Sequence, residues 1–119
     1  MPHLFLEYTG NLALDAKRTL LQINEALVGS GHFDENSIKA RATKLDEYLV
    51  GTQPQAARAF LHMRLAILSG RTPEVKKQVA DLLVAAARKG QDWPPGLQVQ
   101  ITAEVLDMQR EIYGKQVVE

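Results

Sequence analysis

The stretch AFLHMRLAILSGRTP, residues 59–73, runs from a strand through a turn into a helix. Apolar side chains recur at every second position along residues 59–67, which is the period of a β-strand. Serine and glycine then end the strand, because both residues favour turns. Thr72 suits a helix N-cap, and Pro73 suits the first helical position. The sequence therefore predicts a strand, a turn and a helix in direct succession here.

The residues after this unit complete a β-α-β arrangement. An apolar stripe with helical spacing continues to Ala86, and Gly90 ends the helix. The segment DWPPG, residues 92–96, has the composition of a loop. Apolar and polar residues then alternate along residues 97–105, which predicts a further strand.

The residues before the unit predict another β-α-β arrangement. Residues 2–8 alternate as a strand, and an apolar stripe over residues 16–27 predicts a helix that Gly29 ends. A strand is expected over residues 37–48, and GTQP, residues 51–54, is a loop.

Two β-α-β units in succession predict an α+β fold. We expect a single domain over residues 1–119, with halves of roughly 1–55 and 56–119 and a four-stranded sheet that carries both helices on one face. The strands also place some apolar residues on the other face, so we expect other copies of the chain to cover it. Residues 109–115 are expected to form one helical turn before a short terminal strand.

Composition excludes several classes of protein. The chain has 14 basic and 14 acidic residues, so no net charge would attract nucleic acid or an anionic membrane surface. It has no cysteine, and its three histidines lie far apart in the sequence, so neither a disulfide nor a metal is expected. No signal peptide or apolar run of membrane-spanning length is apparent, which favours a cytoplasmic location.

Pro2, at the head of the first strand, has two interpretations. Proline tolerates the first position of a strand, where no ladder hydrogen bond needs its nitrogen, so Pro2 can be incidental. If Met1 is removed, as is expected when the second residue is small, Pro2 instead exposes a secondary amine. Burial and neighbouring cations would lower the pKa of that amine and provide a free base near neutral pH.

Lys39, Arg41 and Arg71 are the candidate anion-binding residues. Lys39 and Arg41 lie two apart, so they face the same side of a strand. Arg71 lies in the turn before a helix N-terminus, which favours anions. Single basic residues at such positions are usually solvated, but together the three can bind carboxylates.

The other residues considered are not expected to be catalytic. His62 is expected to pack or to form hydrogen bonds rather than to catalyse, His3 points to the face opposite Pro2, and Trp93 is expected to anchor its loop. Neither a nucleophile elbow nor a phosphate-binding loop is present, so the sequence does not support a hydrolase or a nucleotide enzyme.

Four blocks in order along the chain, PHLFLEYTGNL, IKAR, AFLHMRL and LSGR, resemble the 5-carboxymethyl-2-hydroxymuconate isomerase family of the tautomerase superfamily. VQITAEVLDM and the closing YGK extend the likeness nearly from end to end. The resemblance makes the catalytic interpretation of Pro2 the preferred one. It implies a tautomerase-like fold assembled as a homotrimer, with the processed amino-terminal proline as general base and no cofactor or metal.

The reaction that the resemblance implies interconverts keto and enol groups, so the enzyme would be an intramolecular oxidoreductase. The proline takes a proton from the 2-hydroxyl of a small unsaturated di- or tricarboxylate, such as 5-carboxymethyl-2-hydroxymuconate, and delivers one to carbon. The implied pathway is bacterial breakdown of homoprotocatechuate. Arg71 matches the arginine of the family's G-R turn.

This chain departs from the family's pattern at one position. Members often read IRSR where it reads IKAR, so Lys39 stands where a family arginine binds substrate, and Arg41 keeps the second arginine. Lysine keeps the charge but loses the bidentate fork, which leaves the substrate-binding role open between Lys39 and Arg41.

Two alternatives to the isomerase stay open. With Met1 in place the Pro2 nitrogen is a tertiary amide without basicity, as expected of a non-catalytic trimeric binding or scaffold relative. Hydratase or dehalogenase chemistry on the same proline is the other alternative.

Overall fold

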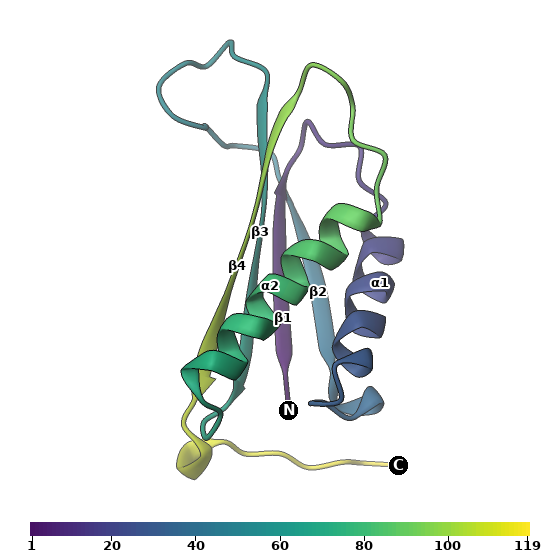
Figure 1. The fold of residues 1–119 in the computed structure, drawn as a ribbon, viewed down its shortest axis with the longest axis vertical. Helices are drawn as coiled ribbons and strands as arrows, with labels where there is room; N and C mark the ends of the chain where they lie inside the picture. Colours follow the sequence, from purple (N-terminus) through teal and green to yellow (C-terminus); the bar gives the residue numbers. More distant parts are fainter.

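The computed structural model describes residues 1–119 and contains one four-stranded sheet and two long helices (Figure 1). The elements in chain order are β1 (His3–Thr9), α1 (Ala16–Gly29), the 3₁₀ turn η1 (Glu35–Ser37), β2 (Lys39–Leu45), β3 (Arg58–Leu68), α2 (Pro73–Lys89), β4 (Gln98–Met108) and the 3₁₀ turn η2 (Arg110–Ile112). The α+β class predicted from the sequence is confirmed. Neither helix has the length and apolarity needed to cross a lipid bilayer.

The strand order is β2-β1-β3-β4, with the first strand of each half at the centre. β1 pairs with β2 in parallel and β3 pairs with β4 in parallel, whereas β1 and β3 are antiparallel, with His3 opposite Ala66. The starts of β1 and β2 therefore lie at the same edge of the sheet as the ends of β3 and β4. Both chain termini are at this edge in Figure 1.

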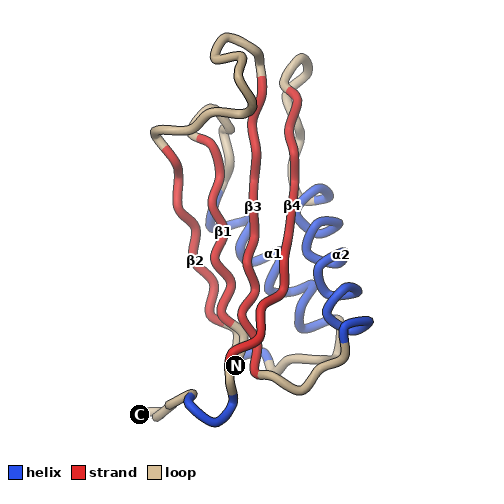
Figure 2. The backbone as a smooth tube through the Cα atoms, turned by 90° about the vertical axis from the view of Figure 1, so that its left-hand side faces the viewer, coloured by secondary structure: helices blue, strands red, loops and turns tan.

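Both helices cover one face of the sheet, as predicted, and the other face is open (Figure 2). Alternation along the strands sorts the side chains: Leu4 and Leu6 of β1 are buried under the helices, whereas Phe5 between them is 40% exposed on the open face. β3 is apolar on its covered side for its whole length. The buried core consists of Leu4, Leu6, Tyr8, Leu12, Ile23, Leu27, Ile38, Ala59, Leu61, Met63, Leu65, Ile67, Val79, Leu83 and Ala87.

The start of α2 follows the predicted capping chemistry. The Thr72 hydroxyl accepts a hydrogen bond from the Val75 N–H at 3.2 Å, Pro73 is the first helical residue, and Gly90 is the C-cap. α1 starts from Asp15, whose carboxylate accepts from the Arg18 N–H, and its last residue is Gly29. These local bonds satisfy donors that the first turn of a helix leaves free.

Three sequence predictions differ from the structure. The second strand was expected over residues 37–48 but is shorter, because Ser37 belongs to η1, where its hydroxyl donates to the Asp34 carbonyl at 2.7 Å. The predicted terminal strand is absent: η2 supplies the expected helical turn, but residues 113–119 pair with no strand of this chain. β4 also continues past residue 105 to Met108, because β3 extends to Leu68 and pairs with it.

Gly10→Ala tests the tight exit from β1. The Gly10 N–H donates to the Leu45 carbonyl at 2.8 Å, and a Cβ on residue 10 would lie 2.7 Å from that same oxygen. Because backbone cannot yield as a side-chain tip can, we expect a loss of about 1–3 kcal/mol in the free energy of unfolding. Denaturant unfolding measures it. Gly29→Ala is the control, since no atom lies within 4 Å of its added Cβ, and alanine favours the helix. Equal stability of the two variants would contradict the steric account.

Candidate active site

The edge where the four strand ends meet contains the amino terminus. Pro2 is fully buried, and its carbonyl accepts a hydrogen bond from the Lys39 N–H at 3.0 Å, which extends the pairing of β1 with β2 by one residue. Proline has no N–H to lose at this position. Its ring is therefore fixed by the fold at the start of the central strand, with Met1 immediately beyond it.

A pocket of about 470 Å³ opens beside Met1. Its walls come from the loop after α1, the end of β3, the turn before α2 and the turn after β4. The lining residues are Met1, Gly31, His32, Phe33, Asp34, Ser37, Ile67, Leu68, Gly70, Arg71 and Arg110. Two guanidinium groups, one carboxylate and several apolar side chains thus face the same cavity, which suits a small organic anion.

Arg71, predicted from the sequence, lies in this pocket. Its Nη2 donates to the His32 carbonyl at 2.6 Å, and its Nη1 lies 3.3 Å from His32 Nδ1. The guanidinium also stacks 5.1 Å from the centre of the Phe33 ring. The loop after α1 therefore fixes the direction of Arg71 without neutralising its charge.

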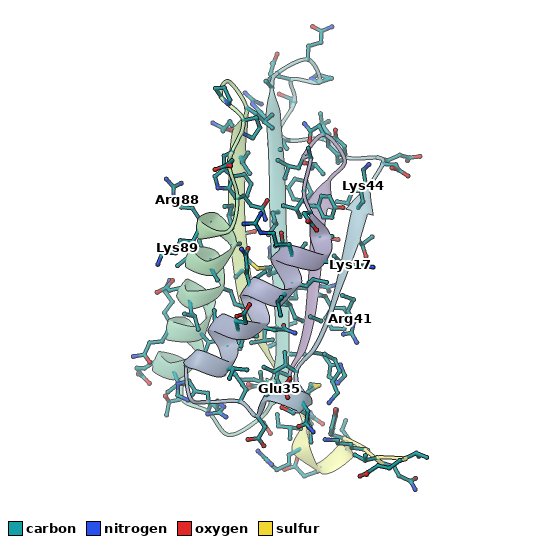
Figure 3. The ribbon with its side chains drawn as sticks, turned by 90° about the vertical axis from the view of Figure 1, so that its right-hand side faces the viewer. Lys17, Glu35, Arg41, Lys44, Arg88 and Lys89 are labelled. Atoms are coloured by element: carbon teal, nitrogen blue, oxygen red, sulfur yellow. The ribbon has the colours of Figure 1, made fainter.

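Lys39 and Arg41 are on the same face of β2, as predicted, but in different surroundings. Lys39 lies next to Pro2 in the pairing of β1 with β2, and its Nζ donates to the Ser37 carbonyl at 2.7 Å. Arg41 extends from β2 on the open face, where its guanidinium lies 4.4 Å from the centre of the Phe5 ring (Figure 3). Neither residue is among those that line the pocket, but Lys39 acts on the Met1 amino group and Arg41 does not. Of the three predicted cations, the structure brings Lys39 and Arg71 together around the amino terminus and leaves Arg41 apart.

Burial and nearby cations both act on the amino terminus. The pKa of the Met1 amino group is lowered from its ordinary value of 8.0, first by burial and then by Lys39, Lys115, Arg71 and Arg110. Both causes act against the charged ammonium form. The Met1 amino group therefore gives up its proton more readily than an amine in water.

Sequence reasoning missed the cations of the C-terminal segment. Arg110 lines the pocket, and the Lys115 ammonium lies 2.9 Å from the Met1 sulfur. The sequence held a signal for Arg110: it follows a strand parallel to the one that leads to Arg71, and the ends of parallel strands share an edge. Recognising that signal required the strand order, which periodicity alone does not provide.

His3 and Tyr113 connect the C-terminal segment to β1. His3 Nε2 lies 3.0 Å from the Tyr113 hydroxyl, and its Nδ1 lies 3.4 Å from Arg41 Nη2. Since arginine can only donate, Nδ1 accepts, which places the proton of the neutral ring on Nε2. The pKa of His3 is lowered from 6.5, first by burial and then by Arg41 and Lys39, which favours this neutral form.

The other residues considered from the sequence have structural surroundings. His62 hydrogen-bonds to Thr102 and Glu104 on the open face, and the Trp93 indole N–H donates to the Arg88 carbonyl, as expected for a loop anchor. No group of three histidine, aspartate or glutamate side chains is arranged to hold a metal ion.

Comparison with known proteins agrees with this geometry. A family profile described as 5-carboxymethyl-2-hydroxymuconate isomerase matches residues 2–115. A solved 5-carboxymethyl-2-hydroxymuconate isomerase from Deinococcus radiodurans R1 is 34% identical and has a TM-score of 0.78, over 97% of this chain and 88% of that one. No curated protein matches the chain significantly.

Two more distant structures share the fold. A 5-carboxymethyl-2-hydroxymuconate delta-isomerase is 20% identical with a TM-score of 0.72, over 99% of this chain and 89% of that one. A fused 4-OT symmetric trimer is 18% identical with a TM-score of 0.72, over 95% of this chain and 90% of that one. Because the family profile spans nearly the whole sequence and the bacterial structure is closely similar, this chain belongs to the 5-carboxymethyl-2-hydroxymuconate isomerase family, which confirms the prediction from its sequence that it is an isomerase.

Proposed function

We propose that this protein is a cofactor-independent keto–enol tautomerase whose general base is Pro2, freed by removal of Met1. The observation that carries the proposal is the position of the amino terminus, partly buried among Lys39, Arg71, Arg110 and Lys115 beside a pocket. Removing Met1 moves the free amine by one residue, onto a rigid secondary amine, and enlarges the pocket at that point. The family to which the chain belongs supports the assignment.

The proposed reaction moves one proton between oxygen and carbon. The uncharged Pro2 nitrogen takes the proton from the 2-hydroxyl of an unsaturated 2-hydroxy acid, leaving a dienolate and a prolinium. The prolinium then returns a proton to a carbon of the dienolate, which yields the conjugated ketone and restores the base. Arg71 and Lys39 stabilise the negative charge while it is spread over the dienolate.

The substrate class follows from the cations. We propose a di- or tricarboxylate such as 5-carboxymethyl-2-hydroxymuconate, because Arg71 presents a fork that matches a carboxylate and has no carboxylate partner in the chain. Lys39 is adjacent to Pro2 and contributes charge. In the single chain Arg41 stacks on Phe5 and not beside the amino terminus. Its role in substrate binding therefore stays a prediction from the sequence.

Pro2→Ala tests the base. We expect turnover of a dienol diacid to fall on the order of 10²–10⁴-fold, because alanine provides a mobile primary amine in place of a fixed secondary one. Ketone formation followed in the ultraviolet measures the rate, and intact mass must establish that Met1 is absent from both proteins.

A matched sample that retains Met1 is the control, because its Pro2 nitrogen is an amide. This sample should be inactive yet unfold at the same temperature as the processed protein. Full activity with Met1 attached, or in Pro2→Ala, would exclude the mechanism. Retention of Met1 in the native host would favour a non-catalytic binding relative, and turnover of haloacrylates alone would favour the dehalogenase alternative.

The pH dependence tests the electrostatic role of Lys39. After burial, its positive charge is the next cause of the lowered pKa of the Met1 amino group, and we expect it to act on Pro2 likewise. The base must be unprotonated, so kcat/KM falls as the pH drops through its pKa. Lys39→Met raises that pKa, and the acid limb of the profile should move to higher pH. Lys44→Met is the control, since Lys44 is at the other end of β2 (Figure 3). The same shift in both variants would contradict a local field.

We further propose a homotrimer that covers the open face of the sheet. Phe5 and Leu106 are exposed large apolar side chains on this face, and the fused 4-OT structures are trimers of similar fold. Light scattering should give about three times the mass of one chain. Phe5→Asp places a charge within the proposed contact and should shift the protein towards the single-chain mass. An unchanged trimer in Phe5→Asp would show that this face is not the contact.

A further inference from the structure

Arg110 is a pocket cation for which the proposed reaction has no role. It begins η2, directly after β4, and its position depends on one residue of the turn between β3 and α2. Ser69 accepts twice from Arg110: its hydroxyl from the backbone N–H at 3.4 Å, and its carbonyl from Nη2 at 3.2 Å. The Ser69 N–H in turn donates to the Met108 carbonyl at 2.9 Å. Arg110 is therefore attached to the same turn that carries Arg71.

Gly70 sets the backbone conformation of this turn. Residue 70 has a φ of +127°, a conformation that favours glycine, and a Cβ there would be 3.9 Å from Arg110 Nη2. The turn thus needs glycine for its backbone conformation, leaves Arg110 at an ordinary contact distance, and supplies Arg71 as the next residue. Both arginines line the pocket.

The charge of Arg110 is held in place but not neutralised. The ion pairs of the structure join His62 to Glu104, Lys76 to Asp107 and Lys77 to Asp81, and none includes Arg110. A guanidinium has five N–H donors, and Ser69 takes only one of them from the side chain. Arg110 is exposed, but its two hydrogen bonds to Ser69 and its place in the pocket wall distinguish it from a freely solvated arginine. Remaining donors are free to bind a second anionic group.

We propose that Arg110 is a specificity-determining residue that binds a carboxylate of the substrate additional to the one held by Arg71. This inference rests on the proposed function for the identity of the substrate. That Arg110 binds a dicarboxylate does not depend on the proposed function. The site would then discriminate between acids by the number of carboxylates they carry. Ser69 is the positioning residue for Arg110.

A pair of unreactive ligands tests the proposal independently of catalysis. Muconate and sorbate share a six-carbon diene and differ in that muconate has a carboxylate at each end, whereas sorbate has one. We expect Arg110→Gln to weaken muconate binding about tenfold in calorimetry, because a charge-assisted hydrogen bond is lost, and to leave sorbate binding unchanged. The muconate affinity of Arg110→Lys should lie between those of wild type and Arg110→Gln, since lysine keeps the charge but lacks the planar fork.

Arg88→Gln is the matched control for net charge. Arg88 lies at the end of α2 away from the C-terminal segment, as Figure 3 shows, and its substitution should alter neither affinity. Ser69→Ala should weaken muconate binding less than Arg110→Gln does, because the Ser69 carbonyl remains. Equal thermal midpoints establish that the variants are folded. Equal losses for muconate and sorbate in Arg110→Gln, or no loss for either, would overturn the proposal.

Kinetics with 2-hydroxymuconate and the matching monoacid, 2-hydroxyhexadienoate, separate the two proposals. Suppose that wild type converts both acids, and that Arg110→Gln raises KM about tenfold for the diacid alone and leaves kcat unchanged. The tautomerase proposal and the binding role of Arg110 then both stand. If wild type converts neither but binds muconate through Arg110, the tautomerase proposal fails and the binding role of Arg110 stands. If wild type converts both and Arg110→Gln behaves as wild type, only the role of Arg110 fails.

Discussion

The antiparallel pairing of β1 with β3 is the constraint from which the site follows. Each β-α-β unit is parallel within itself, so neither unit alone brings the beginning of one strand to the end of its neighbour. Because β1 and β3 run in opposite directions at the centre, the start of the first half meets the end of the second. A parallel central pair would place the amino terminus at the other edge of the sheet, away from Arg71 and Arg110.

The cations at this edge are fixed by backbone carbonyls and not by carboxylates. Lys39 donates to the Ser37 carbonyl, Arg71 to the His32 carbonyl and Arg110 to the Ser69 carbonyl. A carbonyl orients a charged donor without neutralising it, whereas a carboxylate would orient the donor and also neutralise its charge. The chain is neutral overall, yet this edge keeps a local excess of positive charge. Like charges held together this way are costly in the free protein, and an anionic ligand offsets that cost.

The sequence predicted elements whose signal is local and missed those that depend on pairing. Alternation identified β3 and β1, and capping residues identified the start of α2. The alternation that follows Ser37 predicts a strand there, but its hydroxyl closes a 3₁₀ turn instead. In the site, Pro2, Lys39 and Arg71 could be proposed from residue type and position. Arg110 could not, because it joins Arg71 in one pocket only when β4 pairs with β3. Arg41 shares the face of Lys39 but lies about 7 Å further along the strand, beyond the edge where the pocket opens.

The lysine at position 39 fits a division of tasks among these cations. An arginine offers a planar fork that grips a carboxylate, whereas a lysine offers a compact charge. Lys39 pairs with β1 at Pro2 and is the largest charged contribution to the lowered pKa of the amino terminus, a role in which charge matters and a fork does not. On the proposed function, the carboxylates of the substrate bind to the two arginines of the pocket, Arg71 and Arg110. In this arrangement the carboxylates bind to residues of the turns after β3 and β4. Lysine in place of the arginine common at position 39 therefore leaves the affinity for these carboxylates intact.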